Sequence, residues 1–446
     1  MKNIVFLPSQ ESSFHEFLYY ANRIKKTTKH SCQFFLPKIS LIKYEHILQN
    51  HDINYYVPKN YRNNLVSYFE KIIGFIFQKI SIIRKLDHMK NSIIFMLRKL
   101  EVKSFLKKNE ANIVVLADDR VIANFYNTSF LVICKEYKIP TLIPPWANFS
   151  GKNRMLQHRR NNKNLFLATD CEIPENLIQG EKNKYRIYDM DIYKVLKSHK
   201  IFPKNPLAVG GGLASNVFTA SKNEKSRLVK AGINKNKVYI SGNPRHDVLF
   251  NFQNDKEKLK DEILLNHTHL EKNKKNILFN VPALFEDQFS SLDNALKYYN
   301  DIFDVIKNLK QNVILSFHPK MKMNLYGNLL KRYNLKIIDY KIEKLIPISD
   351  IYIGLYSTID QWSILCKVPV IIPDFLNLNY KMYDHFKSIK KVFNKFDLKN
   401  EMENFLNKNC RSDRLQILEE DSKKLYPFDG RSEERFIKGL LSISKK

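Results

Sequence analysis

Three short apolar runs in the second half of the chain constrain its fold more than any other feature. They occupy residues 313–317 (VILSF), 351–355 (IYIGL) and 368–372 (VPVII), and each ends in a polar or proline-containing corner. A segment of helical length precedes the last run, so the order is strand, loop, helix, strand. This order is typical of a parallel α/β sheet, which binds its ligands at the carboxyl ends of the strands.

Two of these corners carry polar residues that suit a phosphate. Ser357 and Thr358 directly precede a helical pattern, where backbone N–H groups and the positive end of a helix dipole face an anion. His318 and Lys320 follow the preceding strand and could reach the same diphosphate. We therefore predict a nucleotide-binding site formed by His318, Lys320, Ser357 and Thr358, with Asp360 as a further candidate.

Each corner also has an interpretation that needs no ligand. Ser357 with Asp360 three residues later matches a capping box, which closes a helix N-terminus by itself. A His-Pro pair after a strand is, by itself, also compatible with an ordinary loop. The site is favoured because the two corners occur in order along the chain, separated by one strand-and-helix unit.

Residues 218–249 (FTASKNEKSRLVKAGINKNKVYISGNPRHDVL) extend this pattern. They contain a strand ending in serine, a helix ending in a glycine turn, a short strand, the triplet Gly-Asn-Pro and then Asp247. Together with the two corners, residues 218–375 resemble GT-B type nucleotide-sugar glycosyltransferases and the related UDP-N-acetylglucosamine 2-epimerases. Bacterial capsule, polysialic-acid and CDP-glycerol transferases share the same His-Pro and Ser-Ser/Thr pairs.

The resemblance implies an α/β protein of two Rossmann-like parallel-sheet domains facing a cleft, with the two corners on the donor's phosphates and nucleotide. It implies a UDP- or CMP/CDP-linked sugar as co-substrate and no separate cofactor. One position departs from the family pattern. Many members carry an acid for the donor ribose five residues after the first serine of the pair, where this chain has Trp362. A cytidine donor is therefore as credible as a uridine donor.

The length of 446 residues is sufficient for two α/β domains with full cores. We predict an N-terminal acceptor-side domain, a linker rich in Lys, Glu and Asn, a C-terminal donor domain and a C-terminal tail helix, over residues 1–250, 251–275, 276–425 and 426–446.

Four residues of the first domain are candidates for the catalytic base that takes a proton from the acceptor hydroxyl. Glu11 and His15 follow the predicted strand 3–7, and Asp118 and Asp119 follow a buried strand. The alternative for Glu11 and His15 is a solvated capping loop, and for Asp118 and Asp119 it is a helix N-cap. The only run of three glycines, 210–212, lacks the GxGxxG spacing and indicates a tight turn.

The formal net charge of +29 suggests an anionic partner, although lysine is abundant throughout the chain and a general compositional bias would give the same charge. Residues 61–108 form a basic, amphipathic helical pattern that would suit an anionic membrane surface or, alternatively, two core helices with a solvated lysine face. No zinc-finger, helix-turn-helix or RNA-binding signature occurs, so we expect no nucleic-acid partner.

The five cysteines are scattered and never form a CxxC pair, which argues against a zinc site or a disulfide framework. We find no signal-peptide layout and no apolar run of about 18 residues. The expected location is therefore cytoplasmic, with peripheral attachment to the inner face of the membrane as the alternative.

These observations predict a metal-independent glycosyltransferase that makes capsule, lipooligosaccharide or a related surface polysaccharide, with a nucleotide-sugar donor and a glycan or lipid-linked acceptor. The alternatives are a CDP-glycerol-type glycerophosphotransferase, a 2-epimerase-like enzyme and a non-catalytic relative that binds glycan or lipid.

Overall fold

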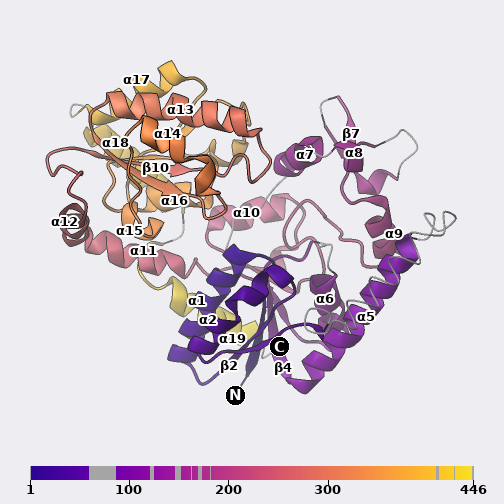
Figure 1. Cartoon of the computed structure of the whole chain (residues 1–446). Coiled ribbons are helices and arrows are strands. Elements are labelled where there is room, and N and C mark those ends of the chain that lie inside the picture. The colour runs from indigo at the N-terminus through magenta and orange to yellow at the C-terminus, as the bar shows by residue number, and fades with distance from the viewer. Residues whose placement is uncertain are drawn as a thin grey trace. The chain divides into compact units, whose positions relative to one another are not determined.

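The structure is a computed structural model that describes residues 2–59, 87–120, 125–145, 152–161, 163–168, 173–180, 182–407, 411–425 and 427–443 (Figure 1). The chain divides into two compact units. Unit 1 comprises Met1–Ala220, Glu224–Ser241 and Glu434–Lys446, and unit 2 comprises Ser221–Asn223 and Gly242–Glu433.

Unit 1 is built on a seven-stranded parallel sheet with the order β3-β2-β1-β4-β5-β8-β9. Its strands are β1 (Asn3–Leu7), β2 (Ser31–Phe35), β3 (Asn54–Tyr56), β4 (Ala111–Leu116), β5 (Thr141–Ile143), β8 (Asn216–Thr219) and β9 (Val238–Ile240). The central strand β1 is an unbroken apolar run because both faces of the sheet are covered, and residues Ile4 to Leu7 have no exposed surface.

Helices cover both faces of this sheet (Figure 1). One face packs against α1 (Glu11–Thr27) and α19 (Ser432–Ile443), through residues such as Phe17 and Phe436. The other face packs against α5 (Asp87–Lys108) and α6 (Tyr126–Glu136). The remaining elements of unit 1 are α2 (Glu45–Asn50), α7 (Lys152–Asn161), α8 (Lys163–Phe166), α9 (Met190–Ser198), α10 (Lys222–Lys230) and the antiparallel pair β6 (Leu177–Gln179) and β7 (Lys184–Arg186).

Unit 2 is built on a five-stranded parallel sheet with the order β11-β10-β12-β13-β14. Its strands are β10 (Asn276–Val281), β11 (Asn312–Phe317), β12 (Ile351–Ile353), β13 (Val370–Pro373) and β14 (Ile389–Val392). Alternate residues of β10 enter opposite cores, because successive side chains of a strand point to opposite faces: Ile277 and Phe279 lie in one core and Leu278 in the other.

The two faces of the unit 2 sheet are covered by different helices (Figure 1). One face carries α13 (Leu292–Asn308), α14 (Gly327–Arg332) and α17 (Lys395–Leu406). The other face carries α11 (Arg245–Asn254), α12 (Lys256–Asn266), α15 (Ile342–Leu345), α16 (Thr358–Leu365) and α18 (Arg411–Lys424). The predicted fold class, an α/β protein with two parallel-sheet domains, is confirmed.

Two predicted segments differ from the sequence prediction or are described only in part. Residues 251–275, predicted as a linker, contain the last four residues of α11 and all of α12 and belong to unit 2. The basic amphipathic pattern at 61–108 is described only from residue 87, as α5, and residues 61–86 lie outside the described residues.

Candidate functional site

The predicted nucleotide site lies at the carboxyl edge of the unit 2 sheet. His318 directly follows β11, and Ser357 follows β12 after a three-residue corner. Both strands pair in parallel with β10, so these two residues leave the sheet at the same edge. Because β10 lies between them, their backbones are separated by about two strand spacings, roughly 10 Å.

Ser357 is the N-cap of α16. Its side chain accepts a hydrogen bond from the backbone N–H of Ile359, and its own backbone N–H donates to the Asp360 carboxylate over 2.8 Å. Thr358 is the first residue of the helix. The capping box that the sequence suggested is therefore present, and it places the Ser357 hydroxyl beside the positive end of the α16 dipole.

Asp360 is fully buried beneath this cap. One carboxylate oxygen accepts the Ser357 N–H, and the other accepts the hydroxyl of Tyr352 over 3.1 Å. Burial raises the pKa of Asp360 to about 7, although both hydrogen bonds oppose that shift. These contacts make Asp360 a residue that positions the start of α16, rather than one that touches a ligand at the sheet edge.

The His318 corner is joined to the loop that follows β10. The backbone N–H of His318 donates to Val281, the last residue of β10, and its ring Nδ1 accepts the backbone N–H of Lys320 over 3.2 Å. A neutral ring that accepts at Nδ1 carries its proton on Nε2, so the ring can also act as a donor. The Lys320 ammonium pairs with the Asp287 carboxylate, 2.6 Å away.

Sequence reasoning missed Asp374, which organises the loop after β13. This fully buried carboxylate accepts hydrogen bonds from the hydroxyl of Tyr356 over 2.8 Å and from the backbone N–H groups of Leu378 and Asn379. The sequence did contain a signal for this residue, because Asp374 directly follows an apolar strand. The same kind of position made Asp118 a candidate in unit 1. Asp374 thereby ties the corner that precedes Ser357 to the neighbouring loop.

Two tyrosines brace the Ser357 corner from this side. Tyr356 has a backbone φ of 51°, which bulky residues rarely adopt, and is held there by its bond to Asp374. Tyr383 donates its hydroxyl proton to the carbonyl oxygen of Ser357 and stacks on the ring of Tyr356. The backbone that leads into α16 is therefore fixed in place before any ligand binds.

Trp362 occupies the position at which many relatives carry an acid. Its side chain is 7% exposed and packs edge-on against His246, with ring centroids 6.2 Å apart. Burial lowers the pKa of His246 to about 4, so this ring is neutral at physiological pH. The indole is part of the core, and no carboxylate takes its place on α16, because Asp360 is used by the cap.

The catalytic candidates of unit 1 also gather at one sheet edge, because β1 and β4 are adjacent parallel strands. Glu11 is the first residue of α1 and pairs with Lys43 at 3.4 Å, and the neighbouring Tyr44 hydroxyl is the main cause of its lowered pKa. His15 lies one turn further, exposed, with its ring edge-on to Tyr44 at 5.1 Å. Glu11 and His15 therefore form a small exposed cluster.

The two aspartates after β4 have different environments. Asp118 forms an ion pair with Arg120 at 2.5 Å. Asp119 is 3% exposed and accepts backbone N–H bonds from Gly210 (2.7 Å), Gly212 (2.9 Å) and Ala214 (3.3 Å). Burial and the Asp118 charge raise the pKa of Asp119 to about 6 against these hydrogen bonds. Asp119 thus serves as the anchor of the glycine turn.

Two further observations concern the described residues alone. Within the described ranges, no three His, Cys, Asp or Glu side chains are grouped so that they could hold a metal ion. Among the helices that the structure describes, none has the length and apolar character needed to cross a membrane.

Comparison with known proteins gives a family match over the same region. Residues 214–385 match the family CDP-Glycerol:Poly(glycerophosphate) glycerophosphotransferase, a segment that contains both corners of the unit 2 site. No curated protein matches the chain significantly.

Several solved structures share the fold. The UDP-GlcNAc 2-epimerase of Neisseria meningitidis, bound to UDP-GlcNAc, is similar with a TM-score of 0.56 and 12% identity, covering 99% of this chain and 100% of that one. The wall teichoic acid polymerase TagF, in a variant soaked with CDPG, has a TM-score of 0.52 and 14% identity, covering 99% and 88%. A glycosyltransferase of Rickettsia africae has a TM-score of 0.51 and 14% identity, covering 100% and 98%.

The resemblance that the sequence indicated is confirmed at the level of the fold, since both comparisons point to the same group of proteins. The chain shares the two-domain, GT-B type fold of these epimerase and transferase structures, and its residues 214–385 match the CDP-glycerol glycerophosphotransferase family.

Proposed function

We propose that this chain is a transferase that takes a glycerol phosphate unit from a CDP-activated donor and adds it to a bacterial surface polymer such as a capsule or lipooligosaccharide. The family match over residues 214–385 carries this proposal, because it spans both corners of the unit 2 site. The match favours glycerophosphate transfer over the glycosyl transfer that the sequence first suggested.

The chemistry would proceed by attack of an acceptor hydroxyl oxygen on the phosphorus that carries the glycerol. The new P–O bond forms as the bond to the nucleoside monophosphate breaks, and that monophosphate leaves with the bridging oxygen. Ser357, the α16 N-terminus and the Nε2–H of His318 would stabilise the negative charge on the leaving group. Lys320 would exchange Asp287 for a phosphate oxygen.

The acceptor proton would pass to a base of unit 1. Glu11 and His15 suit this role better than Asp119, whose carboxylate is buried and holds three backbone N–H groups. Asp118 is a weaker candidate because its pair with Arg120 is short, at 2.5 Å, and mostly buried, whereas Glu11 meets Lys43 at 3.4 Å in an exposed pair. We therefore assign the proton transfer to Glu11 or His15.

The second candidate is a metal-independent glycosyltransferase with a UDP- or CMP/CDP-linked sugar. It is favoured by the similarity in fold to an epimerase that binds UDP-GlcNAc. The two candidates use the same corners, since either donor presents phosphates to His318 and Ser357. The two candidates differ in the group transferred. They also differ in the nucleotide if the sugar is carried by UDP or CMP, because the glycerol phosphate donor carries CDP.

A thermal-shift series separates these candidates, because a ligand that binds only the native state raises the melting temperature. The ligands are CDP, CDP-glycerol, CMP, UDP, UDP-GlcNAc and GDP, each with and without EDTA. Glycerophosphate transfer predicts the largest shift with CDP-glycerol, unchanged by EDTA. A shift confined to UDP and UDP-GlcNAc would favour glycosyl transfer, and a shift lost in EDTA would contradict metal independence.

We further propose that α5 contacts an anionic membrane surface, where a lipid-linked acceptor would lie. Met89, Ile93, Met96, Leu97 and Leu100 are 41–62% exposed. At 100° per residue they occupy one face about 100° wide. The opposite side of α5 is buried in the core of unit 1. An exposed apolar face flanked by lysines suits the headgroup region of an anionic bilayer.

Vesicle sedimentation tests this contact. The protein should sediment with vesicles that contain anionic lipid and much less with neutral ones. A variant with Ile93→Ser and Leu100→Ser should lose most of the binding, because both side chains are exposed and their replacement leaves the core intact. Equal sedimentation of the variant and the unchanged protein would exclude α5 as the contact.

A further inference from the structure

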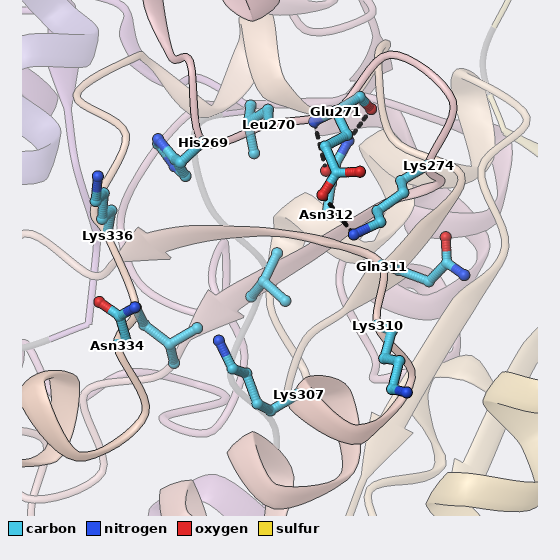
Figure 2. A pocket seen from close by; sticks show the side chains of 12 residues that line it. His269, Leu270, Glu271, Lys274, Lys307, Lys310, Gln311, Asn312, Asn334 and Lys336 are labelled. Atoms are coloured by element: carbon cyan, nitrogen blue, oxygen red, sulfur yellow. Dashed lines mark hydrogen bonds and ion pairs between the residues drawn. The ribbon is translucent and has the colours of Figure 1, made fainter.

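A separate pocket of about 430 Å³ lies at the opposite edge of the unit 2 sheet, where β10 and β11 begin (Figure 2). It is formed by the segment before β10, the end of α13, the first residues of β11 and residues 334–336. Since β11 is six residues long, about 20 Å of strand separates this pocket from His318. The pocket is therefore distinct from the predicted nucleotide site.

The lining of this pocket is strongly basic. It contains Lys274, Lys307, Lys310 and Lys336 and a single acid, Glu271, so four positive charges face one negative charge. Figure 2 shows these lysines spread around the pocket, with Lys336 on one side and Lys274 and Lys310 on the other. Glu271 is paired with Lys274 at 2.5 Å and neutralises only that lysine.

The ammonium groups of Lys307, Lys310 and Lys336 make no hydrogen bond or ion pair with any residue in the described part of the chain. The negative end of the α13 dipole accounts for a lysine at position 307, in the last helical turn. It does not account for Lys336, which comes from another segment. The clustering of uncompensated positive charge around one hollow therefore indicates an anionic ligand.

The wall of the pocket is rigidly built. The Asn312 side chain accepts the backbone N–H of Glu271 over 2.9 Å and donates to the carbonyl of Glu271 and to Asn276. The Gln311 side chain accepts the backbone N–H of Lys275 over 2.8 Å. These bonds fix the segment before β10 against β11, so the pocket keeps its shape without a ligand.

The interior of the pocket offers both apolar contact and a further polar atom. Leu270, Val313 and Leu335 line it, and they suit the carbon skeleton of an organic anion. His269 also lines the pocket. Its ring Nε2 is shielded from solvent and has no hydrogen-bond partner among the described residues.

We propose that this pocket binds a multiply charged phosphate ligand, such as a phosphate-bearing segment of a polyanionic chain, at a site separate from the nucleotide site. Three uncompensated lysines match two or three phosphate charges, and the volume accommodates a segment of a few units. The proposal does not depend on the transfer reaction, because it rests on unit 2 alone.

Isothermal titration with tripolyphosphate tests the proposal on the full chain at moderate ionic strength. The pocket variant combines Lys307→Gln, Lys310→Gln and Lys336→Gln, all exposed positions whose replacement preserves the core. We expect its affinity for tripolyphosphate to fall at least tenfold. Absence of binding to the unchanged protein would overturn the proposal.

A matched control carries the same change of charge elsewhere in unit 2. It combines Lys258→Gln, Lys297→Gln and Lys390→Gln, which are exposed lysines outside the pocket. We expect less than a twofold change in the affinity of this control for tripolyphosphate. An equal loss of affinity in both variants would indicate non-specific electrostatic attraction and would overturn the proposal. Binding lost in His318→Ala but kept in the pocket variant would place the phosphate in the nucleotide site instead.

A second readout follows the His269 ring by NMR. Burial, followed by the charge of Lys336, lowers the pKa of His269. Tripolyphosphate in the pocket should raise that pKa, because the anion offsets the nearby lysines. An unchanged His269 titration at saturating tripolyphosphate would contradict binding at this place.

Discussion

The carboxylate of Asp119 accepts a hydrogen bond of 2.7 Å from the backbone N–H of Gly210, a residue 91 positions further along the chain. Two more backbone N–H groups of the same turn, from Gly212 and Ala214, complete the contact. The glycine run, which the sequence indicated as a tight turn, and Asp119, which it offered as a candidate base, are thus parts of one structural anchor in unit 1.

Replacement of Asp119 should destabilise unit 1. Asp119→Asn replaces one accepting oxygen with an NH₂ group that faces backbone donors, so we expect a loss of roughly 1–3 kcal/mol. Asp118→Asn should cost less, because that side chain is only partly buried and pairs with Arg120. The midpoint of urea unfolding, followed by far-UV circular dichroism, measures both, and an equal effect of the two changes would contradict the anchor.

Gly212 should tolerate no side chain. A Cβ atom at this position would lie 2.2 Å from the carbonyl oxygen of Asp119, so Gly212→Ala must displace the turn. Gly327→Ala is the matched control, because a Cβ atom there would meet no atom within 4 Å. We expect a fall of several degrees in melting temperature for Gly212→Ala and little change for Gly327→Ala, and similar melting of the two would count against a close contact.

The two corners of the unit 2 site should bind the nucleotide. We expect His318→Ala and Ser357→Ala each to weaken nucleotide affinity about tenfold or more, since each removes a hydrogen bond to a charged phosphate. Ser363→Ala is the control on the same helix, because its buried hydroxyl has no partner among the described residues. Affinity unchanged in either variant would remove that residue from the site.

The capping role of Ser357 can be separated from its role in binding. Ser357→Asp keeps a good N-cap but places a negative charge where the phosphate would lie. We therefore expect a melting temperature close to that of the unchanged protein together with strongly reduced nucleotide affinity. Nucleotide binding that survives this change would indicate that the cap is purely structural.

The stability of unit 2 should depend on pH through His246. Burial lowers the pKa of its ring from 6.5 to about 4, so the unfolded chain binds the proton more tightly than the folded one. The contribution of His246 is therefore complete above pH 6.5 and is lost as the pH falls toward 4. Between pH 7 and pH 5 the loss amounts to about 2 kcal/mol.

The variant His246→Gln isolates this effect, because other groups, such as Asp360, also titrate in the same range. The difference in unfolding free energy between the unchanged protein and the variant should shrink by about 2 kcal/mol from pH 7 to pH 5. A difference that stays constant with pH would mean that His246 becomes protonated without cost in the folded protein.

The sequence determined the fold class because parallel strands that are buried on both faces leave continuous apolar runs. Residues 3–7 were predicted as a strand, and β1 has these bounds. The apolar run 313–317 likewise lies within β11 (Asn312–Phe317). The capping box at Ser357 was also visible, since it depends on residues three positions apart. Local patterns of this kind need no knowledge of the rest of the chain.

Only the tertiary structure decided which polar residues are exposed at the sheet edges and which serve the architecture. Asp119, Asp360 and Asp374 are all nearly or fully buried acids after strands or in a helix cap, and each is occupied by donors from the surrounding chain. For Asp119 those donors lie more than ninety residues away. The charge of a buried carboxylate is stabilised by whatever donors the fold brings to it, and local sequence does not specify that neighbourhood.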